Sequence, residues 1–150
     1  MVEEPMDLIR LEGEGNSVVL RITGRERRED LAAAGAESAE FEVLAAEFVV
    51  DTPFVRGSLK AWVFPEELRQ WQEALDALDA GQDIAWREGT RGPDLHIERD
   101  GDGERVHVTV RDDSTAMTAV TVTVPLVDSW FDDAYQRLEL AWKTWPPNED

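Results

Sequence analysis

The two histidines are the residues with the clearest potential for chemistry. His96 and His107 lie on either side of Asp100-Gly101-Asp102-Gly103, whose Asp-Gly steps favour a tight hairpin. If this turn closes symmetrically, His96 faces His107 across two strands. Two adjacent imidazoles can hold a zinc ion or respond to pH. A zinc site needs a third ligand, and none is fixed nearby, so a solvated cross-strand pair is the simpler interpretation.

The segment from Asp100 to Glu104 carries three acidic side chains at alternate positions, a donor pattern that suits calcium. It lacks the bidentate glutamate that completes an EF-hand loop, and its flanks are predicted strands instead of helices. An ordinary hairpin is the favoured interpretation. Pairs of carboxylates carry no information about hydrolysis, because 33 Asp and Glu residues produce close pairs by chance. We therefore predict no metal site and no catalytic residue.

Common catalytic and nucleotide-binding motifs are missing from the sequence. It contains no Walker-type phosphate loop, no Gly-x-Gly-x-x-Gly after a strand, no His-Glu-x-x-His and no Gly-x-Ser-x-Gly. Gly13-x-Gly15 lies between two predicted strands and is interpreted as a turn. There is no cysteine, which excludes disulfides, thiolate metal sites and cysteine nucleophiles. We expect a protein that is not an enzyme and needs no cofactor.

Alternating and β-branched segments predict an antiparallel sheet of about seven or eight strands. The predicted strands are residues 7–11, 17–24, 41–51, 55–64, 84–86, 95–98, 105–111 and 119–126. Short turns connect most of them, and strands joined by short turns cannot be parallel. The mixed-charge stretch 25–40 is interpreted as a surface loop or a frayed short helix.

Two segments have the apolar spacing of amphipathic helices. The first begins at Pro65 and ends near Gly81, and the second begins after Asp128 or Ser129 and ends before Pro146. The apolar stripe of the first helix consists of Leu68, Trp71, Leu75 and Leu78. That of the second consists of Phe131, Ala134, Tyr135, Leu138, Ala141 and Trp142. The sequence thus predicts a single α+β domain, residues 1–150, with one mid-chain helix and one C-terminal helix.

Six tryptophans are many for a chain of 150 residues. Trp71, Trp130 and Trp142 lie on or beside the apolar helix faces and are expected in the core. The other three are Trp62, Trp86 and Trp145. Core burial is also favoured for these three, although they could be partly exposed anchors for a partner.

The formal net charge of −18 is the most unusual feature of the composition. Such a charge repels nucleic acid and anionic membranes and attracts cationic proteins at long range, although acidity can also serve solubility alone. We therefore expect a cationic protein partner, with no direct binding to nucleic acid or membrane. The carboxylates expected to face this partner lie off the apolar stripe of the first helix: Glu73, Asp76, Asp79 and Asp83. Acidic clusters at 37–42 and at Asp112-Asp113 compete with them.

The N-terminus is acidic where a signal peptide would be basic and then apolar. No apolar run approaches the ~20 residues that span a bilayer. We expect a cytoplasmic protein. The bias of Arg over Lys, with abundant Ala, Asp and Glu, suggests a GC-rich bacterial genome.

A succession of glycine, aromatic and aliphatic residues runs along residues 7–145. It comprises Gly15-Asn16-Ser17, Ile22-x-Gly24, Phe48-x-Val50, Phe54-x-x-Gly57, Leu59, Trp62, Pro65-Glu66-Glu67-Leu68, Leu75, Leu78, Trp86, Leu95-x-Ile97, Val106-x-Val108-x-Val110, Val120-x-Val122-x-Val124 and Leu138. This order resembles the WapI family of bacterial immunity proteins and related actinobacterial proteins of unknown function. The stretch 25–40 has no counterpart in that family.

The resemblance implies an immunity role, in which a small cytoplasmic protein binds and neutralises a toxin. In the best-known case the toxin is a tRNA-cleaving nuclease domain. A nuclease presents cations to phosphate, so a carboxylate-rich inhibitor can be steered to that surface and cover it. Two alternatives stay open: a protein-interaction domain unrelated to toxins, and a small-ligand-binding protein or hydrolase with a pocket near His96 and His107.

Overall fold

The computed structural model describes residues 5–30, 39–88, 92–101, 104–112 and 117–145, with the backbone alone for 26–30 and 39–42. These residues form eight strands and two helices. In chain order the elements are β1 (Met6–Gly13), β2 (Asn16–Asp30), β3 (Ala39–Asp51), β4 (Arg56–Val63), α1 (Pro65–Asp79), β5 (Ile84–Trp86), β6 (Asp94–Arg99), β7 (Arg105–Asp112), β8 (Thr118–Pro125) and α2 (Ser129–Thr144). The predicted α+β class, with a mid-chain and a C-terminal helix, is confirmed.

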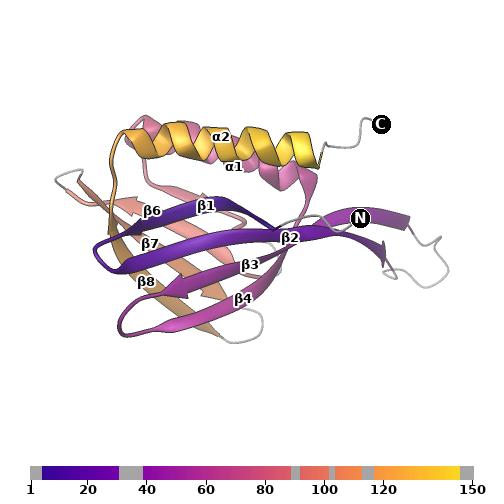
Figure 1. Ribbon diagram of the computed structural model, residues 1–150, viewed down its shortest axis with the longest axis horizontal. Coiled ribbons are helices and arrows are strands. Elements are labelled where there is room, and N and C mark those ends of the chain that lie inside the picture. The colour runs from indigo at the N-terminus through magenta and orange to yellow at the C-terminus, as the bar shows by residue number, and fades with distance from the viewer. Residues whose placement is uncertain (1–4, 31–38, 89–91, 102–103, 113–116, 146–150) are drawn as a thin grey trace.

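The eight strands are divided equally between two antiparallel sheets. The first sheet has the order β1-β2-β3-β4 and the second has the order β5-β6-β7-β8, so each strand pairs with its neighbour in the chain. The strands of the two sheets cross at a wide angle (Figure 1). The division falls at α1, because this helix carries the chain away from the edge of the first sheet before β5 begins.

The core lies between the sheets, where their apolar faces meet. Leu20, Ile22 and Phe48 of the first sheet and Ile97 and Val108 of the second are at most 1% exposed. Along β7 a buried residue alternates with a partly exposed one from end to end. This is the pattern of a strand with one face in the core, as its sequence predicts.

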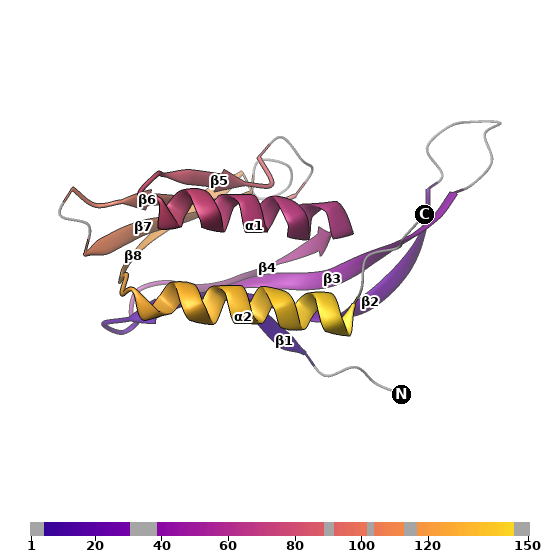
Figure 2. The same ribbon diagram turned by 90° about the horizontal axis from the view of Figure 1, so that it is seen from above.

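The two helices lie side by side along one open side of the two sheets (Figures 1 and 2). α1 contacts β5 and α2 contacts β1, so each helix covers the edge of a different sheet. The apolar stripe predicted for the first helix is confirmed, since Leu68, Trp71, Leu75 and Leu78 are all buried. Gly81, with φ 95°, ends α1 in the left-handed conformation that glycine adopts at low cost.

The turn between β1 and β2 packs against β8 and joins the sheets at one corner. Asn16 Nδ2 donates a hydrogen bond of 2.9 Å to the Thr123 carbonyl. A Cβ atom at Gly13 would lie 2.5 Å from the Pro125 ring, so this contact requires glycine.

The interpretation of residues 25–40 as a loop or short helix is wrong at both ends. Residues 25–30 continue β2, and Ala39 and Glu40 begin β3, with pairing that extends to Asp30 opposite Ala39. The pairing of β1 with β2 reaches no further than Ile22, and the pairing of β4 with β3 reaches no further than Leu44. The two strands therefore continue alone as a ribbon beyond the sheets (Figure 1). Residues 25–30 lack the hydrophobic alternation that predicts a strand, but their hydrogen bonds to β3 hold them in β-structure. Residues 31–38 lie outside the described residues.

Five of the six tryptophans are buried or partly buried, and Trp62 is 36% exposed. Trp86 and Trp145, which were possible anchors, are 2% and 3% exposed. The rings of Trp71 and Trp86 pack together with centroids 5.2 Å apart. Of the six, Trp62 is the most exposed. None of the helices formed by the described residues is long and apolar enough to cross a membrane.

Candidate protein-binding surface

The four carboxylates predicted to contact a partner all lie on or beside α1 and are exposed. Glu73, Asp76 and Asp79 are on the helix, and Asp83 follows it in the connection to β5. Of the competing clusters, Asp112 is only 4% exposed and cannot contribute to a surface. Asp113 lies outside the described residues, as do the side chains of 37–42.

The four carboxylates differ in what they bind within the chain. Asp76 Oδ1 accepts a hydrogen bond of 2.5 Å from the Tyr135 hydroxyl of α2. Asp83 Oδ1 accepts one of 2.8 Å from the Arg99 backbone N–H. Glu73 and Asp79 have no hydrogen bond or ion pair with any residue in the described part of the chain. Asp76 and Asp83 therefore hold elements together, while Glu73 and Asp79 are free to meet a partner.

Tyr135 is held in its neutral form by this arrangement. Partial burial, the hydrogen bond to Asp76 and the nearby charge of Asp79 all raise the pKa of Tyr135. The hydroxyl thus stays a donor and bridges the two helices, which fixes the position of Asp76 relative to α2.

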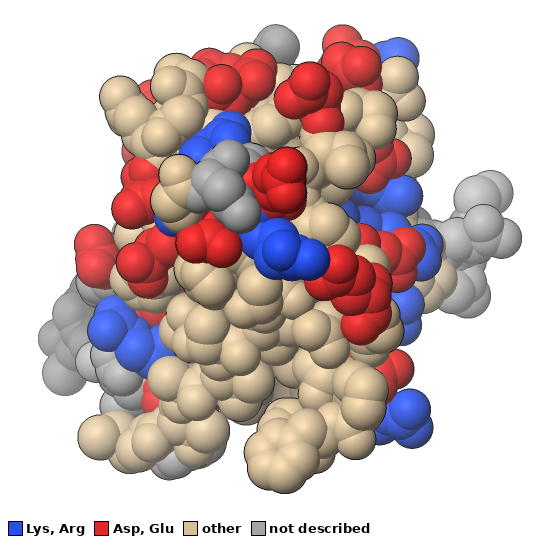
Figure 3. Space-filling view, turned by 90° about the vertical axis from the view of Figure 1, so that its left-hand side faces the viewer, with Lys and Arg blue, Asp and Glu red and all other residues tan. Residues whose placement is uncertain are grey.

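The negative charge extends from α1 onto α2. Among the exposed residues of the two helices, six are acidic and two are basic. The acidic residues are Glu66, Glu73, Asp76, Asp79, Asp132 and Glu139, and the basic residues are Arg69 and Lys143. We call these six carboxylates, with Asp83, the acidic helix surface. Charged side chains crowd the upper half of the end view in Figure 3, on the side of the molecule where the helices lie.

The end of α1 is electrostatically unfavourable within the chain. Asp76 and Asp79 occupy its last turns, where the helix dipole is already negative, and no basic residue lies in the last turn. Carboxylates at that end of a helix typically cost 0.3–1 kcal/mol each. The N-terminus of the antiparallel helix α2 lies beside them and offsets part of this cost (Figure 2).

An open groove of about 470 Å³ runs between α1 and β5. Five consecutive residues, Ile84 to Glu88, form one bank, so the backbone of an edge strand is part of its wall. Glu73 lies on the opposite bank, and the lining also includes the largely buried residues Ala74 and Trp86. Glu88, like Glu73, is exposed and has no partner among the residues that the structure describes. The groove therefore carries two exposed carboxylates that have no partner among the described residues.

A buried ion pair that was not predicted from the sequence supports this groove. Arg87 Nη1 lies 2.7 Å from Glu67 Oε1, and both side chains are less than 10% exposed. The same guanidinium donates to the carbonyls of Trp62 and Pro93, each at 2.9 Å. It thus connects the end of the first sheet, the start of α1 and the second sheet.

Glu67 makes further contacts at the start of α1. Its Oε1 accepts a hydrogen bond of 2.9 Å from the Phe64 N–H, and its backbone carbonyl accepts one of 2.8 Å from Trp86 Nε1. Burial raises the pKa of Glu67, and the charge of Arg87 opposes that rise. Burial also lowers the pKa of Arg87. A glutamate at the third helical position is a capping-box signal that could have marked Glu67. No local signal marks Arg87, whose backbone has φ 69°.

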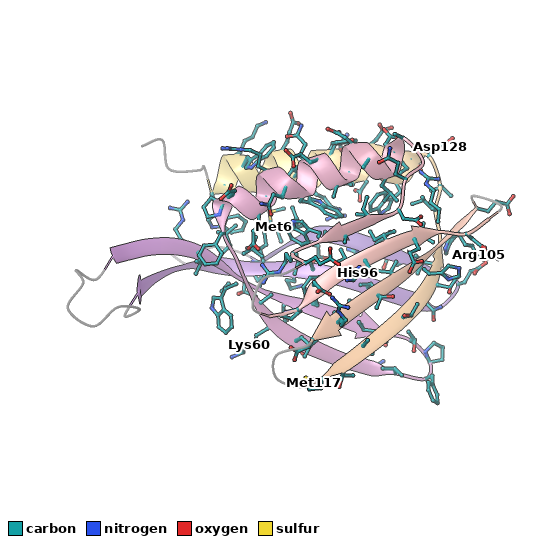
Figure 4. The ribbon with its side chains drawn as sticks, turned by 180° about the vertical axis from the view of Figure 1, so that it is seen from behind. Met6, Lys60, His96, Arg105, Met117 and Asp128 are labelled. Atoms are coloured by element: carbon teal, nitrogen blue, oxygen red, sulfur yellow. The ribbon has the colours of Figure 1, made fainter. Side chains whose placement is uncertain are left out.

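The predicted pairing of the histidines is wrong. His96 lies opposite Thr109, and His107 lies opposite Glu98, because the Asp100 N–H donates to the Arg105 carbonyl and the turn is centred one residue later in the chain than expected. The observed register differs from the predicted one by two residues. Because side chains alternate between the two faces of a strand, a shift of two leaves both imidazoles on the outer face of the second sheet. Figure 4 shows His96 on that face.

Each histidine instead contacts neighbours on the strands. His96 Nε2 lies 3.1 Å from Asp94 Oδ1, whose other oxygen accepts a bond of 2.9 Å from Arg111 Nη2. His107 Nδ1 lies 2.9 Å from Thr123 Oγ1. Neither imidazole lines the groove between α1 and β5. Within the described residues, no group of three or more His, Asp and Glu side chains is placed to hold a metal ion.

Comparison with protein families gives one match, DUF5959, a family of unknown function, over residues 6–146. The chain belongs to this family. The match to DUF5959 spans every helix and strand from β1 to α2, so the whole fold described above is covered. Comparison with curated protein sequences finds no match. The chain is similar to the solved structure of the plant transcriptional regulator PBF-2, with TM-score 0.49 and 9% identity over 96% of this chain and 87% of that chain.

Proposed function

We propose that this protein binds and neutralises a cationic protein through the acidic helix surface, as an immunity protein does to a nuclease toxin. The observation that supports this most is the excess of exposed carboxylates on the two helices, six against two cations. A surface of this kind attracts a basic protein over about one Debye length, ~8 Å at physiological salt. The resemblance to WapI-type immunity proteins supplies the nature of the partner.

The position of Asp79 favours a binding role over a structural one. Asp79 is exposed at the unfavourable end of α1 and has no partner among the described residues. A cation from another protein would relieve the repulsion that Asp79 experiences from Asp76 and from the helix dipole. Charges that cost stability and serve no internal contact are typical of functional sites.

The groove between α1 and β5 is the place where a basic side chain fits best. The charge of an Arg or Lys of the partner can meet Glu73 and Glu88 on the two banks of this groove. Arg87 also borders the groove, but its charge is already compensated by Glu67 at 2.7 Å.

The test begins with capture of the partner on the immobilised full-length chain from an extract of the source organism. Association of the purified partner is then followed by stopped flow from about 20 mM to about 500 mM salt. We expect the association rate constant to fall at least ~10-fold over this range, while dissociation changes less. If the partner cleaves tRNA, an equimolar amount of the chain should abolish cleavage.

Two matched double variants locate the surface. Glu73→Gln with Asp79→Asn removes two free carboxylates from the acidic helix surface and should slow association and lower its dependence on salt. Glu47→Gln with Glu98→Gln removes the same charge from the outer faces of the sheets and should leave both unchanged. An association rate indifferent to salt, or equal effects of the two pairs, would show that the acidity serves solubility only. A captured partner without toxin activity would instead favour an interaction domain unrelated to toxins.

A further inference from the structure

A small apolar groove opens on the side of the molecule opposite the helices. It lies between β4 of the first sheet and β8 of the second, and its volume is about 180 Å³. Its lining includes Phe48, Val50, Leu59, Val110 and Val120, and none of its nine lining residues is charged. A cavity of ~150 Å³ in another protein holds a benzene molecule, so this groove has room for one phenyl ring.

A phenyl ring of the right size stands beside this groove. Phe54 is 95% exposed, and the next residue, Val55, lines the groove. Its turn is well anchored, because Thr52 Oγ1 accepts hydrogen bonds of 3.1 Å and 2.8 Å from the N–H groups of Phe54 and Val55. Met117, next to the lining residue Thr118, is 77% exposed on the other side. The backbone that carries the ring is thus already ordered, which lowers the entropy cost of binding.

We propose that two copies of the chain form a two-fold symmetric dimer in which Phe54 of each enters the apolar groove of the other. A ring and a groove on the same face of one molecule are self-complementary under a two-fold axis, and two such contacts form at once. This inference does not depend on the proposed function.

The charge distribution also favours a second copy at this face. Two chains of net charge −18 repel each other, and the repulsion is least where the contacting surfaces are uncharged. At the rim, Arg56 and Asp51 neutralise each other in an ion pair of 3.0 Å. Met117 and Asp128 lie on opposite sides of the molecule in Figure 4, so the acidic helix surface would stay accessible in the dimer.

The edge of β4 that faces away from β3 adds a second complementary feature up to Ala61, beyond which the Trp62 carbonyl already accepts a bond from Arg87. β4 pairs with β3 on one side, and no described strand pairs with its other side. A two-fold axis beside such an edge places the same strand of the second copy antiparallel to it, where backbone groups can pair.

The oligomeric state is measured by sedimentation equilibrium over a range of protein concentrations. We expect a monomer–dimer equilibrium that is strengthened by added salt, because salt screens the repulsion and leaves the apolar contact intact. Phe54→Ser should weaken dimerisation about 100-fold or more, since two rings leave the interface. Its melting temperature as a monomer should be unchanged. Val127→Ser, at a residue that is 59% exposed and does not line the groove, is the matched control.

A second variant fills the groove instead of removing the ring. Gly57 lines the groove, has no atom within 4 Å of a Cβ position and does not need a glycine backbone conformation, so Gly57→Leu is tolerated. Gly57→Leu alone should be monomeric. A mixture of Phe54→Ser with Gly57→Leu should associate more tightly than either alone, because one ring then meets one open groove. A wild-type chain that stays monomeric to about 1 mM, or a Phe54→Ser chain that dimerises as before, overturns the proposal.

Discussion

At the scale of single residues, the pair Glu67 and Arg87 controls the geometry around the α1–β5 groove. Both charges are buried, and the guanidinium satisfies the carbonyls of Trp62 and Pro93 as well as the carboxylate. Removing one member of such a pair leaves the other charge without compensation in a poorly solvated site. The pair therefore stabilises the junction of the sheets only when it is complete.

We expect Arg87→Met to lower the free energy of unfolding by about 3–5 kcal/mol, because the Glu67 carboxylate is then buried alone. Adding Glu67→Leu should cost less than the sum of the two single changes. The measurement is urea denaturation of the four members of this double-mutant cycle.

The same variants give a pH test with a defined sign. Without Arg87, the pKa of Glu67 in the folded state rises further above its unfolded value, because the guanidinium is what opposes the effect of burial. The folded protein then binds a proton more tightly than the unfolded chain. The loss of unfolding free energy caused by Arg87→Met should therefore become smaller as the pH falls from about 8 to about 5. A loss that does not change with pH would mean that Glu67 is not the group left without a compensating charge.

At the scale of elements, α1 is the part whose packing follows most directly from the sequence. Its stripe of Leu68, Trp71, Leu75 and Leu78 has helical spacing, and the fold buries all four residues against β5 and the core. Its polar face carries the free carboxylates. One helix thus provides both the cover of the second sheet and the candidate binding surface.

Leu75→Ala should lower the free energy of unfolding by about 2–5 kcal/mol, since the fully buried side chain leaves a cavity. Leu140→Ala on α2 is the matched control, because Leu140 is 52% exposed and its loss should change stability by no more than about 0.5 kcal/mol. Thermal and urea unfolding of the two variants measure this directly. Equal effects would contradict the packing of α1.

At the scale of the whole molecule, charge and apolar surface lie on different sides. The acidic helix surface covers one open side of the sheets, and the uncharged groove beside Phe54 lies on the other. The proposed cationic partner and the proposed second copy would then bind without competition. We expect them to respond oppositely to salt, which should weaken the first contact and strengthen the second.

The net charge of −18 should also affect stability as a whole. Carboxylates lie closer together in the folded chain than in the unfolded chain and therefore repel one another more strongly. Screening of this repulsion by salt favours the folded state. We expect the melting temperature to rise by a few degrees from about 10 mM to about 150 mM salt. Dilute Phe54→Ser protein is the sample of choice, because dimerisation then makes no contribution. A melting temperature that falls with salt would mean that attractive ion pairs dominate.

The sequence by itself determined the order of the elements and the class of fold. Periods of two and of 3.6 residues are local properties, so β7 and α1 could be located from neighbouring residues alone. The candidate carboxylates Glu73 and Asp79 could be named for the same reason, since most polar residues off the apolar stripe of α1 face solvent, with the buried Glu67 as the exception.

Only the tertiary structure decided what depends on residues distant in the chain. The register of β6 and β7 follows from the position of a turn that the hydrophobic pattern does not fix to the residue, so His96 and His107 were paired wrongly. The continuation of β2 to Asp30 depends on hydrogen bonds to β3, and the Glu67–Arg87 pair joins residues on separate elements. Asp76 and Asp83 are bound within the chain because α2 and β6 fold back onto α1. Such contacts arise from three-dimensional proximity, which no local period encodes.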